Sequence, residues 1–108
     1  MELEKYRSRQ LPKHPVIYMP VKWCRVFGIN IGEEVDITCD KRNIFIERAN
    51  PDSIYNKRYV TEKNAINIPK EIKEELGIEP YQLYSLYIDK KNERFIISLG
   101  HLEEPVFN

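Results

Sequence analysis

The first 25 residues have an excess of basic side chains. Six of them are basic, while only Glu2 and Glu4 are acidic, which leaves a local excess of four positive charges. Cationic side chains displace counterions from nucleic-acid phosphates, and arginine also forms paired hydrogen bonds with guanine. Because the whole chain has 17 basic and 17 acidic residues, such chemistry depends on local distribution and not on net charge. The six basic residues are Lys5, Arg7, Arg9, Lys13, Lys22 and Arg25.

The sequence contains no residue pattern typical of a catalytic or metal-binding site. Cys24 and Cys39 form no CxxC pair, and His14 and His101 add no spacing typical of a metal site. No serine, cysteine or carboxylate stands in a recognisable nucleophile or acid–base signature. We therefore expect no enzyme activity, no cofactor and no metal, and we expect both cysteines to be reduced packing residues.

The composition is that of a folded domain in water. The 108 residues are 42% hydrophobic and 11% aromatic, and no apolar run approaches the roughly 20 residues needed to cross a bilayer. The first residues include acidic side chains, and no apolar segment follows them. A secretory signal would instead have a basic start followed by an apolar segment. We expect one compact domain over residues 1–108, in the cytoplasm and without membrane contact.

The sequence repeats itself at a distance of 49 residues. This shift aligns residues 17–20 (IYMP) with 66–69 (INIP), and residues 27–29 (FGI) with 76–78 (LGI). Further along, the second copy gains two residues, which we place at the tip of a hairpin, where insertions are tolerated. We predict a first repeat at 6–49, a polar linker at 50–53, a second repeat at 55–100 and a short tail at 101–108.

The second copy predicts the order β-α-β-β. An extended apolar run at 65–68 indicates a strand, and Pro69 suits the first turn of a helix that ends at Gly77. Within this helix Ile72 and Leu76 lie four residues apart on one face, a spacing that Trp23 and Phe27 repeat in the first copy. Two strands at 83–88 and 94–99 then flank a polar turn at 89–93.

A single copy would leave strand edges open and one face of its sheet uncovered, so it requires a partner. We expect the two copies to interlock into one six-stranded structure with pseudo-twofold symmetry. We also expect Trp23 and the tyrosines to serve packing and not to stack on nucleic acid. The tyrosines in question are Tyr55, Tyr59, Tyr81, Tyr84 and Tyr87.

Residues 60–78 read VTEKNAINIPKEIKEELGI and resemble a known family. The similar pattern is V-T-x-K-G-x-apolar-x-I-P-K-x-apolar-R-x-x-L-G-I, found in the AbrB/MazE/SpoVT swapped-hairpin DNA-binding regulators. Residues 27–35 (FGINIGEEV) are similar to the continuation L-G-I-x-x-G-D-x-V. The chain departs from the pattern at Asn64, which replaces a glycine, and at Tyr81 and Gln82, which replace the Gly-Asp pair.

The resemblance implies a fold class and a function. The implied fold is mostly β with two short helices, a swapped-hairpin, double-psi-type barrel built here by two β-α-β-β repeats of one chain. The implied function is transcriptional regulation on double-stranded DNA in the nucleoid. Apart from the resemblance, Arg7 and Arg9 precede the first predicted strand, and we expect them to form a mobile basic arm that forks onto guanine or phosphate. The expected DNA contacts are Arg7, Arg9, Lys13, Lys22, Arg25, Lys57, Arg58, Lys63, Asn64, Lys70 and Lys73.

Two alternatives stay open at this point. A protein-interaction module or antitoxin-like component with the same fold would suit the near-zero net charge and the acidic second half. Only nine residues follow Leu99, and Pro105 interrupts them, so we expect this tail to be too short to wrap a toxin. Two chains could pair as a homodimer, or the duplication could replace the dimer. Because the halves have diverged, we expect an asymmetric DNA site.

Overall fold

The structure of this chain is a computed structural model that describes residues 3–100. These residues form a mostly β fold with two short helices. The elements are β1 (Leu3–Gln10), β2 (Val16–Tyr18), α1 (Val21–Phe27), β3 (Glu34–Asp40), β4 (Asn43–Arg48), β5 (Asn56–Tyr59), β6 (Ala65–Asn67), α2 (Lys70–Leu76), β7 (Leu83–Asp89) and β8 (Arg94–Leu99). In the described part of the chain neither helix has the length or apolar character to span a membrane.

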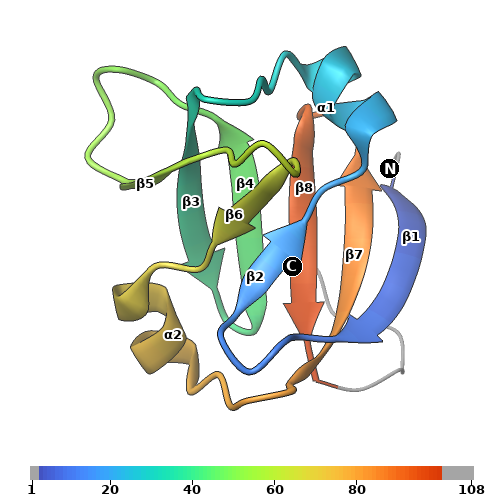
Figure 1. The fold of residues 1–108 in the computed structure, drawn as a ribbon, viewed down its shortest axis with the longest axis vertical. Helices are drawn as coiled ribbons and strands as arrows, with labels where there is room; N and C mark the ends of the chain where they lie inside the picture. Colours follow the sequence, from blue (N-terminus) through green and yellow to red (C-terminus); the bar gives the residue numbers. More distant parts are fainter. Residues whose placement is uncertain (1–2, 101–108) are drawn as a thin grey trace.

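Six of the strands form one antiparallel sheet in the order β1-β7-β8-β4-β3-β5. The other two, β2 and β6, pair antiparallel as a separate ribbon that crosses in front of this sheet (Figure 1). The helices α1 and α2 lie at opposite ends of the molecule. The hydrophobic core contains inward-facing residues of both sheets, including Ile17 and Ile66 of the ribbon and Ile46 and Ile97 of the large sheet.

The two helices have the same length and the same boundaries. Each has seven residues, begins directly after a proline and ends at a glycine in the left-handed conformation, Gly28 or Gly77. Glycine suits these C-caps because positive φ costs it no steric strain. The predicted helix, its glycine stop and the hairpin at 83–99 are confirmed.

The strand pairing follows the 49-residue shift. Arg9 pairs with Tyr84 of β7, and Arg58 pairs with Val35 of β3. The two pairs are equivalent, because Arg58 lies 49 residues after Arg9 and Tyr84 lies 49 residues after Val35. Each half therefore pairs its first strand with the hairpin of the other half. At the centre of the ribbon Ile17 faces Ile66, two residues that the same shift relates.

The centre of the large sheet repeats this relation. Phe45 of β4 faces Ile96 of β8, two residues related by the shift of 49 plus the two-residue insertion. Equivalent residues thus face each other at two separate places, once in each sheet.

Two expectations about the strands are wrong. The sequence predicts six strands, three in each half. Residues 3–100 contain eight strands, because each half has one additional strand at its start, β1 in the first half and β5 in the second. Arg7 and Arg9 do not precede the first strand, since both lie within β1. The backbone hydrogen bonds of β1 to β7 hold this segment in the sheet, with a register shift between Lys5 and Arg7.

The aromatic predictions are partly correct. Tyr84 and Tyr87 are buried, and Trp23 is partly buried against the core with its ring centroid 5.7 Å from that of Phe27. Tyr55, Tyr59 and Tyr81, however, are exposed. Of the two cysteines, which are both free thiols, Cys24 is buried and Cys39 is partly buried against the core.

Phe95 provides a direct test of this core. Its side chain is fully buried and its ring centroid lies 5.4 Å from that of Phe27. Replacing Phe95 with alanine should lower the free energy of unfolding by about 3–5 kcal/mol, measured by urea denaturation, because the truncation leaves a cavity. The control Ile54→Ala, at a side chain that is 98% exposed, should change it by less than about 0.5 kcal/mol. Equal effects of the two substitutions would contradict this packing.

Candidate nucleic-acid interface

Each end of the molecule combines a helix from one half with a turn from the other half. The N–H of Met19, just before α1, donates to the carbonyl oxygen of Asn64 at 2.9 Å. The N–H of Ile68, just before α2, donates to the carbonyl oxygen of Pro15 at 3.2 Å. We call α1 with the turn at 61–64 the α1 end, and α2 with the turn at 12–15 the α2 end.

The α1 end brings together four of the predicted DNA contacts. Lys22 and Arg25 are exposed on the helix, and Lys63 is exposed on the turn beside it. Asn64 adopts a positive φ of 56°, which asparagine tolerates better than most residues, so it replaces the family glycine without losing the turn. Arg25 and Asn64 both line a shallow hollow of about 200 Å³ between the helix and the turn.

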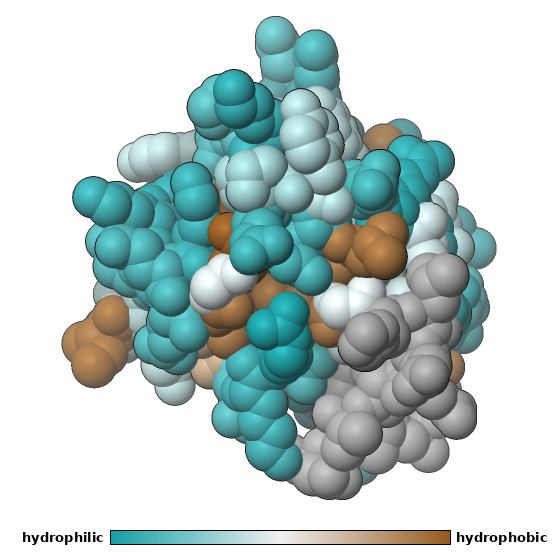
Figure 2. Space-filling model, turned by 90° about the horizontal axis from the view of Figure 1, so that it is seen from below, coloured by the Kyte–Doolittle hydropathy of each residue, from teal (hydrophilic) through white to brown (hydrophobic). Residues whose placement is uncertain are grey.

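The α2 end brings together three further predicted contacts, but acidic groups surround them. Lys13 is exposed on its turn, and Lys70 and Lys73 are exposed on the helix. The same short helix also carries Glu71, Glu74 and Glu75. Figure 2 views the molecule from below in Figure 1, from the side where α2 lies, and shows mostly hydrophilic surface around a small apolar centre.

The first strands contribute one arginine each at matched positions. Arg9 lies in β1 and Arg58 in β5, and the two pairings described above place them in equivalent registers. Arg9 is exposed, and Arg58 is half-exposed with one guanidinium nitrogen donating to the carbonyl oxygen of Lys57 at 2.7 Å. These arginines therefore lie on the two opposite edge strands of the large sheet.

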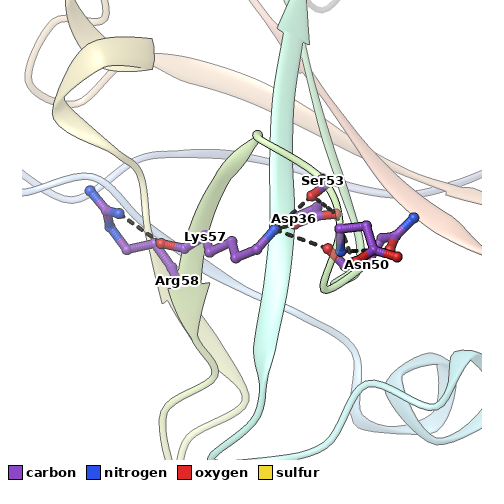
Figure 3. A network of polar contacts seen from close by, with 6 residues as sticks. Asp36, Asn50, Ser53, Lys57 and Arg58 are labelled. Atoms are coloured by element: carbon purple, nitrogen blue, oxygen red, sulfur yellow. Dashed lines mark hydrogen bonds and ion pairs between the residues drawn. The ribbon is translucent and has the colours of Figure 1, made fainter.

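Lys57 is occupied by a structural role. Its ammonium group donates to the carboxylate of Asp36 and, at 2.6 Å, to the hydroxyl of Ser53 (Figure 3). The N–H of Asn50 and the hydroxyl of Ser53 also donate to Asp36, at 3.0 and 2.9 Å. This network fastens the linker at 50–53 to β3, so the assignment of Lys57 as a DNA contact is not favoured by its geometry.

Arg7 is occupied as well. A guanidinium nitrogen of Arg7 donates to the carbonyl oxygen of Tyr18, which joins β1 to the ribbon. The Nε atom of Arg7 is buried and has no hydrogen-bond partner among residues 3–100. The arginine therefore links the two sheets, and its geometry does not favour a role on DNA.

The polar network sets the protonation of Asp36. Burial by itself would raise the pKa of this carboxyl, but hydrogen bonds from Lys57, the Asn50 N–H and Ser53 outweigh burial and lower it below its usual value. Asp89 behaves in the same way, because hydrogen bonds from Asn92 and Arg94 outweigh its burial and lower its pKa. Both carboxylates are thus ionised anchors of turns.

The ribbon presents two side chains that the sequence did not single out. Tyr18 and Asn67 are exposed, and they occupy equivalent positions 49 residues apart on the two ribbon strands. Their neighbours Ile17 and Ile66 point into the core, so the alternation of a strand directs Tyr18 and Asn67 outward. The sequence could have indicated these two residues, because each is the variable residue x of the repeated apolar-x-apolar-Pro motif, and x alternates with the apolar residues that face the core.

The described residues favour neither metal binding nor thiol chemistry. Within 3–100 no group of three histidine, cysteine or acidic side chains is arranged to hold a metal ion. Burial raises the pKa of the Cys24 thiol to about 11, so this thiol is protonated at neutral pH. Cys39, whose pKa is raised to about 11 by burial and by nearby Glu75, is likewise a poor nucleophile.

One known structure resembles this chain in its fold, whereas sequence comparisons find no match. No protein-family model matches the sequence, and no curated protein matches it. The solution structure of PHS018 from Pyrococcus horikoshii is similar to this chain with a TM-score of 0.49 and 18% sequence identity. The similarity covers 98% of this chain and 100% of that one.

The Asp36 network predicts a pH-dependent contribution to stability. Because the pKa of Asp36 is lower in the folded than in the unfolded state, its contribution is complete above the unfolded pKa of about 3.9 and is lost as pH falls through the lower folded pKa. Asp36→Asn should therefore cost about 2–3 kcal/mol at pH 7, and the difference from the wild type should shrink below about pH 4. Urea denaturation across this pH range measures it, and a pH-independent difference would contradict the assignment.

Proposed function

We propose that this chain is a double-stranded DNA-binding regulator of the AbrB-like swapped-hairpin type, in which two repeats of one chain replace the two subunits of a dimer. The observation that carries the proposal is the strand register. Each half gives its first strand to the hairpin of the other half, with a constant shift of 49 residues. This exchange agrees with the pattern that the sequence of residues 60–78 resembles.

The pseudo-twofold relation supports DNA as the partner. Equivalent residues face each other at Ile17 and Ile66 in the ribbon and at Phe45 and Ile96 in the large sheet. An axis through these two places relates the α1 end to the α2 end. DNA-binding proteins with twofold symmetry place their axis on a dyad of the duplex, so that equivalent elements meet two half-sites, and the pseudo-twofold relation in this chain is compatible with that arrangement.

The size of the molecule is compatible with this arrangement. Its longest extent is 31 Å, and the two helices lie at opposite ends of that axis. Successive turns of the same groove lie about 34–36 Å apart. Groups near the two ends therefore come within reach of adjacent groove turns on one side of a duplex.

The exposed groups supply two kinds of contact. Arg9, Arg58 and the turn lysines Lys13 and Lys63 would contact phosphates, which position the protein without reading sequence. Asn67 on the ribbon is suited to reading a base edge, because the carbonyl oxygen and the NH2 group of its side-chain amide can both form hydrogen bonds with adenine. A two-stranded ribbon fits the major groove, which makes β2 and β6 the central reading element of this proposal.

A protein-interaction module with the same fold is the second candidate. Its support is the zero net charge of the chain and the three glutamates of α2. Tyr59 on the open edge strand β5 and Tyr55 directly before that strand are exposed and would also suit a protein contact. Co-purification of a protein partner, together with no binding to DNA, would select this candidate.

The matched arginines give the test of DNA binding. Arg9→Ala and Arg58→Ala should each weaken binding to a duplex from the DNA upstream of the coding region and lower the slope of log affinity against log salt by about 0.9, the value expected for one phosphate contact. Fluorescence anisotropy between about 50 and 200 mM salt measures both quantities.

Lys5→Ala is the control for charge. Lys5 is exposed on the same strand as Arg9, but it pairs with Tyr87 and therefore lies on the face of the sheet away from the core and ribbon. Its removal should leave the slope unchanged. If wild-type protein at micromolar concentration shows no salt-sensitive binding, or if Lys5→Ala acts as strongly as the arginine variants, the proposed interface is wrong.

A further inference from the structure

The two helices carry opposite charges at matched positions. Lys22 and Arg25 on α1 correspond, through the 49-residue shift, to Glu71 and Glu74 on α2. All four side chains are exposed. Within residues 3–100 none of the four forms an ion pair, and the Lys22 ammonium lies 5.2 Å from the centroid of the Trp23 ring.

The helices hold these charges in comparable geometry. Both have seven residues between a proline and a left-handed glycine, as described above. Both also contact a turn of the other half through a backbone hydrogen bond just before the helix. A charge on α1 and its counterpart on α2 therefore occupy equivalent places relative to the pseudo-twofold axis.

The charges on the neighbouring turns reduce the difference in net charge between the two ends but do not remove it. The turn of the α1 end carries Glu62 and Lys63, which balance, while the turn of the α2 end carries Lys13. The α1 end then has three positive side chains and one negative, and the α2 end has three of each, with Lys70, Lys73 and Glu75 as its remaining charges. Glu75 also accepts a hydrogen bond from the Cys39 thiol at 3.1 Å, which holds it towards β3.

We infer that the two ends are not interchangeable on DNA: helix α1 contacts backbone phosphates through Lys22 and Arg25, whereas Glu71 and Glu74 keep helix α2 away from phosphates. The α2 end then contacts the duplex through its turn alone. The chain therefore binds an asymmetric site in one orientation. This inference rests on the proposed DNA-binding function. A pair of identical subunits cannot have this polarity, whereas a duplicated chain can, because its halves change independently.

Charge exchange at the matched positions tests the polarity. Lys22→Gln combined with Arg25→Gln removes two cations from α1, and Glu71→Lys combined with Glu74→Arg places two cations on α2. All the introduced residues are good helix formers, and thermal unfolding followed by circular dichroism verifies folding. The probe is a labelled duplex of about 30 base pairs from the DNA upstream of the coding region, which spans nearly three helical turns.

The α1 variant should lose affinity by roughly tenfold or more and lower the salt slope by about 1.8, since two phosphate contacts are removed. The α2 variant should gain affinity and raise the slope by a similar amount. In hydroxyl-radical footprints the wild type should protect one half of its site more strongly, and the α2 variant should protect both halves alike.

Two further outcomes distinguish a failure of the proposed polarity from a failure of the proposed DNA-binding function on which it rests. If the wild type binds the duplex but protects both halves of its site equally, or if neither variant changes the slope, the polarity is wrong and DNA binding stands. If the wild type shows no salt-dependent binding, the polarity and the proposed function are both wrong.

Discussion

The structure depends on the pairing of each half's first strand with the hairpin of the other half. β1 completes the sheet beside β7, and β5 completes it beside β3, so both outer strands come from the opposite repeat. The ribbon adds a third exchange, because β2 and β6 are short strands that have no partner within their own half. Removing either half would expose the unpaired backbone of the other, and the shared core would be divided. The fold is therefore a property of the duplicated chain and not of one repeat.

Local sequence predicted the elements that have a local cause. The α2 boundaries follow from a proline, a four-residue apolar spacing and a glycine, and the β7–β8 hairpin follows from a polar turn between apolar strands. The repeat itself is visible as a shift of the sequence against itself. The helix boundaries and the hairpin need no knowledge of distant contacts, and the structure confirms both.

The outer strands and parts of the site could not be predicted in the same way. β1 and β5 are edge strands rich in charged residues, and edge strands lack the apolar alternation that marks a half-buried strand. Their partners lie far away in the sequence, with Arg9 facing Tyr84. Likewise, basic side chains look alike in a sequence, whereas the structure separates Lys57 and Arg7, which hold the fold together, from exposed lysines and arginines. Tyr59 was expected to pack, but it falls on the short edge strand and is 66% exposed.

The proposed function places duplex DNA across the ribbon and the two cross-repeat ends. Its most direct test is a titration of isotope-labelled protein with a short duplex, followed by nuclear magnetic resonance of the backbone amides. The chemical-shift changes should concentrate in the turns at 12–15 and 61–64, in α1 and in the ribbon, with weaker changes at α2. Shifts confined to the opposite face of the large sheet, around Lys5 and Phe45, or no shifts at all, would contradict the proposed function.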